Sequence, residues 1–92
     1  MPFDELVWKA QHGSPALEEE NPRGAMAPDL LHGLLTEGMT RDEVRRLLGP
    51  PEREDAQTDV YELGRSAYGV SYEQLAVEYA GGELTRAQLR RV

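Results

Sequence analysis

GMTRDEVRRLLGPP, residues 38–51, predicts a short amphipathic helix with both of its ends marked. Thr40 is a favourable N-cap residue, and Glu43 follows at the three-residue spacing of a capping box. Gly49 can take the left-handed conformation that closes a helix, and the prolines after it cannot continue one. We therefore expect a helix that begins after Thr40 and ends before Gly49.

This predicted helix has one apolar stripe. Val44, Leu47 and Leu48 stand at i, i+3 and i+4, so their side chains share one face. Met39 precedes the cap and has the spacing from Val44 of a hydrophobic staple. The stripe predicts that the helix docks on a core, and it informs us about architecture more than about function.

The residues before this helix predict another one. Residues 28–37, PDLLHGLLTE, carry a leucine stripe, and Pro28 and Asp29 suit a first helical turn. Gly33 weakens a helix by about 1 kcal/mol relative to Ala, which favours a close approach by a neighbouring element at that point. A short connection then joins the two helices into a hairpin.

The residues after the helix predict strands. Residues 58–64 and 74–80 alternate between apolar and polar positions, as strands with one buried face do. Gly81 and Gly82 permit the positive φ of a two-residue turn, which predicts a hairpin to residues 83–91. The composition of that last segment favours a helix, whereas the turn and the need to pair the preceding strand favour a strand, and a strand is our prediction. The expected inward positions are Tyr61, Leu63, Leu75, Val77 and Tyr79.

The chain therefore predicts one small α+β domain. In residues 28–92 we expect a two-helix hairpin packed on one face of a three-stranded antiparallel sheet, in the order ααβββ. Residues 1–27 form an extra N-terminal segment and acidic loop that docks on this domain. Trp8 is either the anchor of that docking or an exposed contact for a partner.

Charge and composition exclude several classes of protein. The formal net charge of −7 argues against nucleic acid and anionic lipid as main partners, because Lys and Arg bind their phosphates. The chain has no cysteine for a disulfide, a thiolate nucleophile or a Cys-based zinc site. No apolar stretch approaches the ~18 residues of a membrane span, and no signal peptide is visible. A cytoplasmic protein is the default expectation, although a chain whose signal peptide had been removed would look the same.

The sequence shows no catalytic constellation. His12 and His32 lack the H-E-x-x-H spacing of a zinc protease, and the serines lack a G-x-S-x-G context. The glycines form neither a P-loop nor a G-x-G-x-x-G motif. We expect no enzymatic activity, no cofactor and no metal site.

Residues 38–51 resemble the GMTxxEVxxLLGxP signature of the SmpA/OmlA (outer-membrane assembly lipoprotein) and β-lactamase-inhibitor-protein-like superfamily. The resemblance implies a unit of two helices and three antiparallel strands that acts in protein binding or assembly without enzymatic activity. This chain has one such unit and no lipobox cysteine, so an outer-membrane role is not carried over. The matching positions are structural, so no binding residue is carried over. The matching residues are Gly38-Met39-Thr40, Glu43-Val44 and Leu47-Leu48-Gly49-Pro50-Pro51, followed by similar strands with Tyr61, Leu63, Gly64, Leu75, Val77 and Tyr79.

The leading hypothesis is a non-enzymatic protein-interaction or assembly module whose partner is another protein. Core or loop packing is the alternative role of the tyrosines. The alternative function is a small-ligand-binding or sensor domain with a cavity between the helices and the sheet. A homodimer formed by edge-strand pairing or by exchange of the N-terminal segment is a third hypothesis. The expected partner-binding residues are outward strand positions, the tyrosines of the loop between residues 64 and 74, and the N-terminal tryptophan: Trp8, Glu62, Tyr68, Tyr72 and Glu78.

Overall fold

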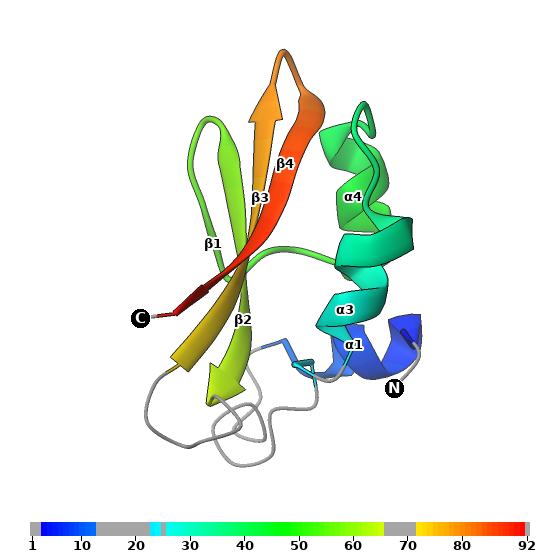
Figure 1. The fold of residues 1–92 in the computed structure, drawn as a ribbon, viewed down its shortest axis with the longest axis vertical. Helices are drawn as coiled ribbons and strands as arrows, with labels where there is room; N and C mark the ends of the chain where they lie inside the picture. Colours follow the sequence, from blue (N-terminus) through cyan, green and yellow to red (C-terminus); the bar gives the residue numbers. More distant parts are fainter. Residues whose placement is uncertain (1–2, 13–22, 25, 66–71, 92) are drawn as a thin grey trace.

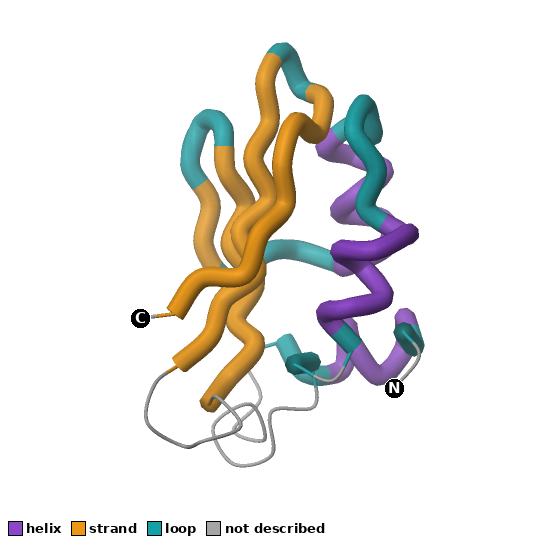
Figure 2. The backbone as a smooth tube through the Cα atoms, viewed as in Figure 1, coloured by secondary structure: helices purple, strands orange, loops and turns teal. Residues whose placement is uncertain are grey.

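The structure is a computed structural model that describes residues 3–12, 23–24, 26–65 and 72–91 (Figures 1 and 2). Figure 2 shows two layers, with the strands in one and the helices in the other. The helical segments are α1 (Glu5–Ala10), α3 (Ala27–Asp29), the π-helix η1 (Leu30–Leu34) and α4 (Arg41–Leu48). The strands are β1 (Arg53–Glu54), β2 (Thr58–Arg65), β3 (Tyr72–Ala80) and β4 (Glu83–Arg91).

The four strands form one antiparallel sheet in the order β1-β2-β3-β4. The helices lie on one side of it, so the predicted α+β class is confirmed (Figure 1). The predicted number of three strands is wrong, because β1 adds a fourth at the edge beside β2. The two charged residues of β1 are too few to show an alternating pattern. The turn into β2 is held by Asp55, whose Oδ1 accepts hydrogen bonds from the amides of Gln57 and Thr58.

Helix α4 has the predicted ends and the predicted buried stripe. The hydroxyl of Thr40 accepts a hydrogen bond from the amide of Glu43 at 3.1 Å, and Gly49 has a φ of 79°. Val44 and Leu48 are buried. A Cβ on Gly49 would stand 3.3 Å from Cγ of Lys9, so this glycine also permits α1 to approach α4 closely.

The helix predicted over residues 28–37 is shorter and changes its type. One turn of α-helix, α3, continues into η1, where the amide of Leu35 donates to the carbonyl of Leu30 at 2.8 Å. This five-residue spacing lets both leucines reach the core, and both are buried. The predicted close approach at Gly33 is wrong, because nothing lies within 4 Å of the position that its Cβ would take.

The core lies between the sheet and the helices. Trp8 is completely buried, and its ring centroid lies 6.1 Å from that of Tyr61. The sequence left two roles open for Trp8, a docking anchor or an exposed partner contact, and its burial confirms the docking role. The other buried apolar residues are Met26, Ala27, Leu30, Leu35, Val44, Leu48, Leu63, Leu75, Ala76, Val77, Tyr79 and Leu84.

The hairpin between β3 and β4 has the predicted turn. Gly81 and Gly82 have φ values of 61° and 81°, and Ala80 pairs with Glu83 on either side of them. The strand prediction for the last segment is therefore confirmed, and the helical alternative is wrong. All five predicted inward side chains are buried. None of the helices formed by the described residues is long and apolar enough to cross a membrane.

Candidate functional site

Strand β4 is an edge of the sheet, and only its beginning is covered. The amide of Leu84 donates to the carbonyl of Met39 at 2.7 Å, and its carbonyl accepts from the amide of Gly38 at 2.9 Å. Beyond Leu84, no other segment of the described chain pairs with the outer side of β4. We call residues 85–91 the open edge.

The pairing with β3 decides which backbone groups the open edge presents. In an antiparallel ladder, hydrogen-bonded and non-hydrogen-bonded pairs alternate. The amide of Tyr79 donates to Gln57, on the β2 side, so the odd-numbered residues of β3 direct their backbone groups away from β4. Their partners in β4 include Ala87 and Leu89. These two residues therefore turn their amides and carbonyls to the outside.

The open edge is a basic segment in an acidic chain. It contains Arg86, Arg90 and Arg91, three of the ten Lys and Arg residues, and no acidic residue. Arg86 and Arg90 are exposed and form no ion pair with any described residue. Nε of Arg91 lies 3.7 Å from the carboxylate of Glu73. The edge thus carries two arginines without a salt bridge beside its outward backbone groups.

An apolar side chain lies at the same edge, on the opposite face. Leu89 stands across from Leu75, which is completely buried, yet Leu89 is 42% exposed. In Figure 1 the C-terminal end of β4 runs away from the helices, in agreement with the exposure of Leu89. The open edge therefore has a cationic side and an apolar side.

Three of the predicted contact residues lie on β2 and β3 and are not fully buried. The carboxylate of Glu62 accepts a hydrogen bond from Nη2 of Arg53 at 2.8 Å, and that of Glu78 accepts one from Nε2 of Gln88 at 3.2 Å. Tyr72 is 41% exposed at the beginning of β3. The structure thus places Glu62 and Glu78 on the face opposite the core, each with a polar partner.

The other two predicted contact residues do not join this face. Trp8 is completely buried and offers no surface to a partner in this structure. Tyr68 lies outside the described residues. The sequence-predicted set is therefore only partly brought together, and the open edge of β4 was not part of it.

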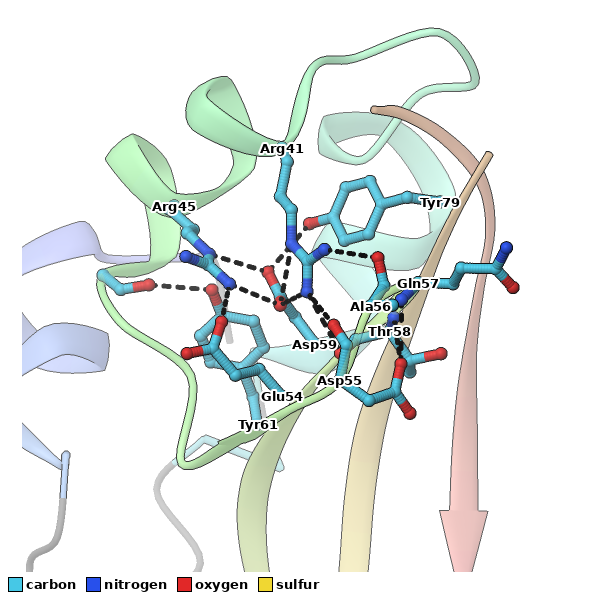
Figure 3. A network of polar contacts seen from close by, with 11 residues as sticks. Arg41, Arg45, Glu54, Asp55, Ala56, Gln57, Thr58, Asp59, Tyr61 and Tyr79 are labelled. Carbon is cyan, nitrogen blue, oxygen red and sulfur yellow. Dashed lines mark hydrogen bonds and ion pairs between the residues drawn. The ribbon is translucent and has the colours of Figure 1, made fainter. Parts of the chain in front are cut away.

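A polar cluster lies between α4 and the sheet and centres on the buried carboxylate of Asp59 (Figure 3). Oδ1 of Asp59 accepts hydrogen bonds from Nη2 of Arg41 at 2.6 Å and from Nη2 of Arg45 at 2.8 Å. Oδ2 accepts from Nε of Arg45 at 3.0 Å and from the hydroxyl of Tyr79 at 3.2 Å. Both carboxylate oxygens are thus occupied by donors of the protein itself.

The electrostatics of this cluster favour a charged aspartate. Burial alone would raise the pKa of Asp59, but the hydrogen bonds and charges of Arg45 and Arg41 outweigh burial and hold this pKa below its ordinary value. Burial raises the pKa of Tyr79, and the charge of Asp59 raises it further. The phenol therefore stays a neutral donor to the carboxylate at neutral pH.

The Asp59 cluster ties α4 to the sheet. Arg41 also donates to the carbonyls of Asp55 at 2.7 Å and Ala56 at 2.9 Å, in the turn between β1 and β2. Its guanidinium lies 4.9 Å from the ring centroid of Tyr79. Because every partner belongs to the fold, we assign this cluster to stability and not to ligand binding.

A second buried cation ties the N-terminal segment to the sheet. Arg23 is completely buried, and its Nε donates to the carbonyl of Trp8 at 3.1 Å. Nη1 donates to the carboxylate of Glu52 at 2.5 Å, and Glu52 also pairs with His12. Among the described residues, Nη2 of Arg23 has no hydrogen-bond partner. The cluster explains why a charged residue is tolerated beside the core.

Sequence reasoning missed Asp59, Arg23 and the arginines of β4. Asp59 stands two residues before Tyr61 in the alternating strand. The alternation that predicts an inward Tyr61 therefore also predicts an inward Asp59. Arg23 lies in a polar stretch without apolar periodicity, so no sequence pattern predicted its burial. The arginines of residues 86–91 had a usable signal, because they cluster without an acidic residue in a chain of negative net charge.

The described residues form shallow surface pockets, and two of them are considered for ligand binding. One, of about 280 Å³, lies on the side of β1 and β2 and includes Arg53, Val60 and Arg90. The other, of about 300 Å³, lies between α1 and α4 and includes Met39 and Leu47. Neither lies between the helices and the sheet, where the alternative function places its cavity.

Within the described ranges, no group of three or more His, Asp or Glu residues is arranged to hold a metal ion.

No protein-family model matches the chain, and no curated protein matches it. The resemblance of residues 38–51 to the SmpA/OmlA signature stays a prediction.

Proposed function

We propose that this protein is a non-enzymatic protein-interaction module that binds an extended segment of another protein along the open edge of β4. The observation that carries the proposal is the row of outward backbone groups at residues 85–91, beside the exposed side chain of Leu89. In strand addition, main-chain hydrogen bonds supply affinity and the alternating side chains supply specificity.

The fold sets the length of the bound segment. The seven residues of the open edge span about 23 Å at about 3.3 Å per residue. At its beginning the edge is closed by Gly38 and Met39, which already pair with Leu84. A partner strand of about seven residues fits between this closure and the end of β4.

The template for this strand is already formed. Strand β4 is paired along its inner side with β3 from Glu83 to Arg91, and the hairpin turn between them has two glycines in the required conformation. A preformed edge lowers the entropic cost of binding, because only the partner segment has to be ordered. The resemblance to a family of assembly and inhibitor proteins supports the same class of function.

A proline substitution tests the proposal directly. Leu89→Pro removes one outward amide, and a proline is tolerated at an edge strand where its missing N–H would face solvent. Leu89→Ala is the matched control, because it removes the same side chain and keeps the amide. Peptides selected from a random display library on the native domain are measured against both variants, with a thermal melt to show that each variant is folded.

We expect the selected peptides to bind Leu89→Ala with reduced affinity and to lose measurable binding to Leu89→Pro. Bound peptide should also slow the hydrogen exchange of the amides of Ala87 and Leu89. Equal binding to the native domain and to a folded Leu89→Pro variant would show that the peptides bind elsewhere, and the proposal would be wrong.

A further inference from the structure

We infer that the segment bound at the open edge of β4 is an amphipathic acidic strand, in which Asp or Glu alternates with apolar residues. This inference rests on the proposed function and specifies the chemistry of its partner. It follows from the charge of the edge and from the faces on which its side chains lie.

The charge of the open edge is opposite to that of the chain. The whole chain has a formal net charge of −7, whereas residues 85–91 contain three arginines and no acidic residue. Arg90 stands opposite the uncharged Gln74, so no cross-strand carboxylate balances its charge. Arg86 stands opposite Glu78, whose carboxylate accepts a hydrogen bond from Gln88. Arg90 therefore has no carboxylate directly opposite it, and Arg86 forms no ion pair with any described residue, although Glu78 stands opposite it.

The register assigns the two faces of the partner strand. Residues directly opposite each other in a sheet point to the same face, with Cβ atoms about 4.5–5.5 Å apart. Positions opposite Arg86 and Arg90 lie on the face away from the helices and favour carboxylates. Positions opposite Ala87 and Leu89 lie on the helix-side face, where Leu89 is 42% exposed, and favour apolar side chains.

The same arginines disfavour a second copy of this chain. If two open edges paired antiparallel about Gln88, Arg86 of each copy would stand opposite Arg90 of the other. Like charges directly opposite each other destabilise a strand pair, and charged edge residues are a common protection against edge-to-edge association. An acidic strand removes this repulsion and replaces it with attraction.

Three synthetic peptides of about nine residues test the inference. Valine alternates with glutamate in the first, with glutamine in the second and with lysine in the third. Their affinities are measured by fluorescence anisotropy at low and at physiological salt, together with an oligothymidylate of similar charge as a polyanion without amides. The protein variants are Arg90→Glu, at the open edge, and Arg46→Glu, an exposed position of α4 that changes the net charge equally. Light scattering reports the oligomeric state of each protein.

The expected result is a graded preference. Each cross-strand ion pair contributes a factor of about 1.4 to 5 in affinity, so the glutamate peptide should bind about tenfold tighter than the glutamine peptide, and the lysine peptide weakest. The preference should shrink with salt because exposed charges are screened. Arg90→Glu should reduce the preference for glutamate at least twofold, whereas Arg46→Glu should leave it unchanged.

Each other outcome has a separate meaning. Equal binding of the glutamate and glutamine peptides would overturn the acidic partner and leave strand addition standing. If Arg90→Glu and Arg46→Glu had equal effects, the preference for glutamate would depend on net charge alone, and the assignment to the open edge would be wrong. Oligothymidylate binding as tight as that of the acidic peptide would lead to the same conclusion. A dimer of the native protein at the concentrations of the binding assay would make a second copy the occupant. Binding of none of the peptides would count against the proposed function itself.

Discussion

Replacing Asp59 with Asn should remove the main link between α4 and the sheet. The substitution keeps the shape of the side chain and removes its charge, while Arg41 and Arg45 lose their shared carboxylate. Breaking a buried ion pair from one side costs about 3–5 kcal/mol. The side chains of the two arginines are 23% and 33% exposed and can be partly rehydrated, so we expect a loss of about 3 kcal/mol. That is a large part of the roughly 5–14 kcal/mol that stabilises a chain of this length.

Urea unfolding followed by tryptophan fluorescence measures this loss, because Trp8 is the single tryptophan and is completely buried. A thermal melt should fall by about 12–24 °C. Glu54→Gln is the matched control in the same cluster: the side chain of Glu54 pairs with Arg45 but is 59% exposed, so its loss should cost less than about 1 kcal/mol.

The pH dependence tests the cause of the effect. The folded state holds the pKa of Asp59 below its ordinary value, so its contribution is fully present above the unfolded pKa of about 3.9 and is lost as the pH falls through the folded pKa. The stability difference between native protein and Asp59→Asn should therefore be constant from about pH 5 to 7 and shrink below about pH 4. A loss no larger than that of Glu54→Gln, or a difference that does not change in acid, would refute the assignment of Asp59 as a charged anchor.

Three further substitutions test the fold. Gly33→Ala should stabilise the protein by up to about 1 kcal/mol in urea unfolding, because a Cβ there meets nothing within 4 Å; a loss would mean that η1 needs its glycine. Gly49→Ala should destabilise by about 1–2 kcal/mol, since φ is 79° and the new Cβ would press on Lys9, and an unchanged midpoint would contradict the strain. Trp8→Ala should cost about 3–5 kcal/mol by calorimetry because the ring is buried against Tyr61, and a cost below about 1 kcal/mol would show that α1 docks without it.

Local signals predicted α4 and the β3–β4 hairpin because the evidence for each is contained in a few neighbouring residues. The cap at Thr40 and the exit at Gly49 define α4 regardless of what surrounds it. Gly81 and Gly82 define a turn, and the turn decided that the ambiguous last segment is a strand. The alternation of β2 also identified its buried face correctly.

The same local reasoning failed where a distant partner decides the outcome. Strand β1 is two charged residues without an alternating pattern, and it is a strand only through its pairing with β2. The leucine-rich segment before α4 becomes partly a π-helix because both Leu30 and Leu35 are drawn into one core. No pattern within either segment contains that information.

The candidate site divides in the same way. The sequence by itself determined that the chain is acidic, and it placed the expected partner contacts at outward strand positions. Only the tertiary structure decided how much of the edge at β4 is covered, because Gly38 and Met39 pair with Leu84. It also decided that Trp8 is buried and Leu89 exposed. Composition and periodicity report what each residue prefers, whereas exposure depends on contacts between segments that lie far apart in the chain.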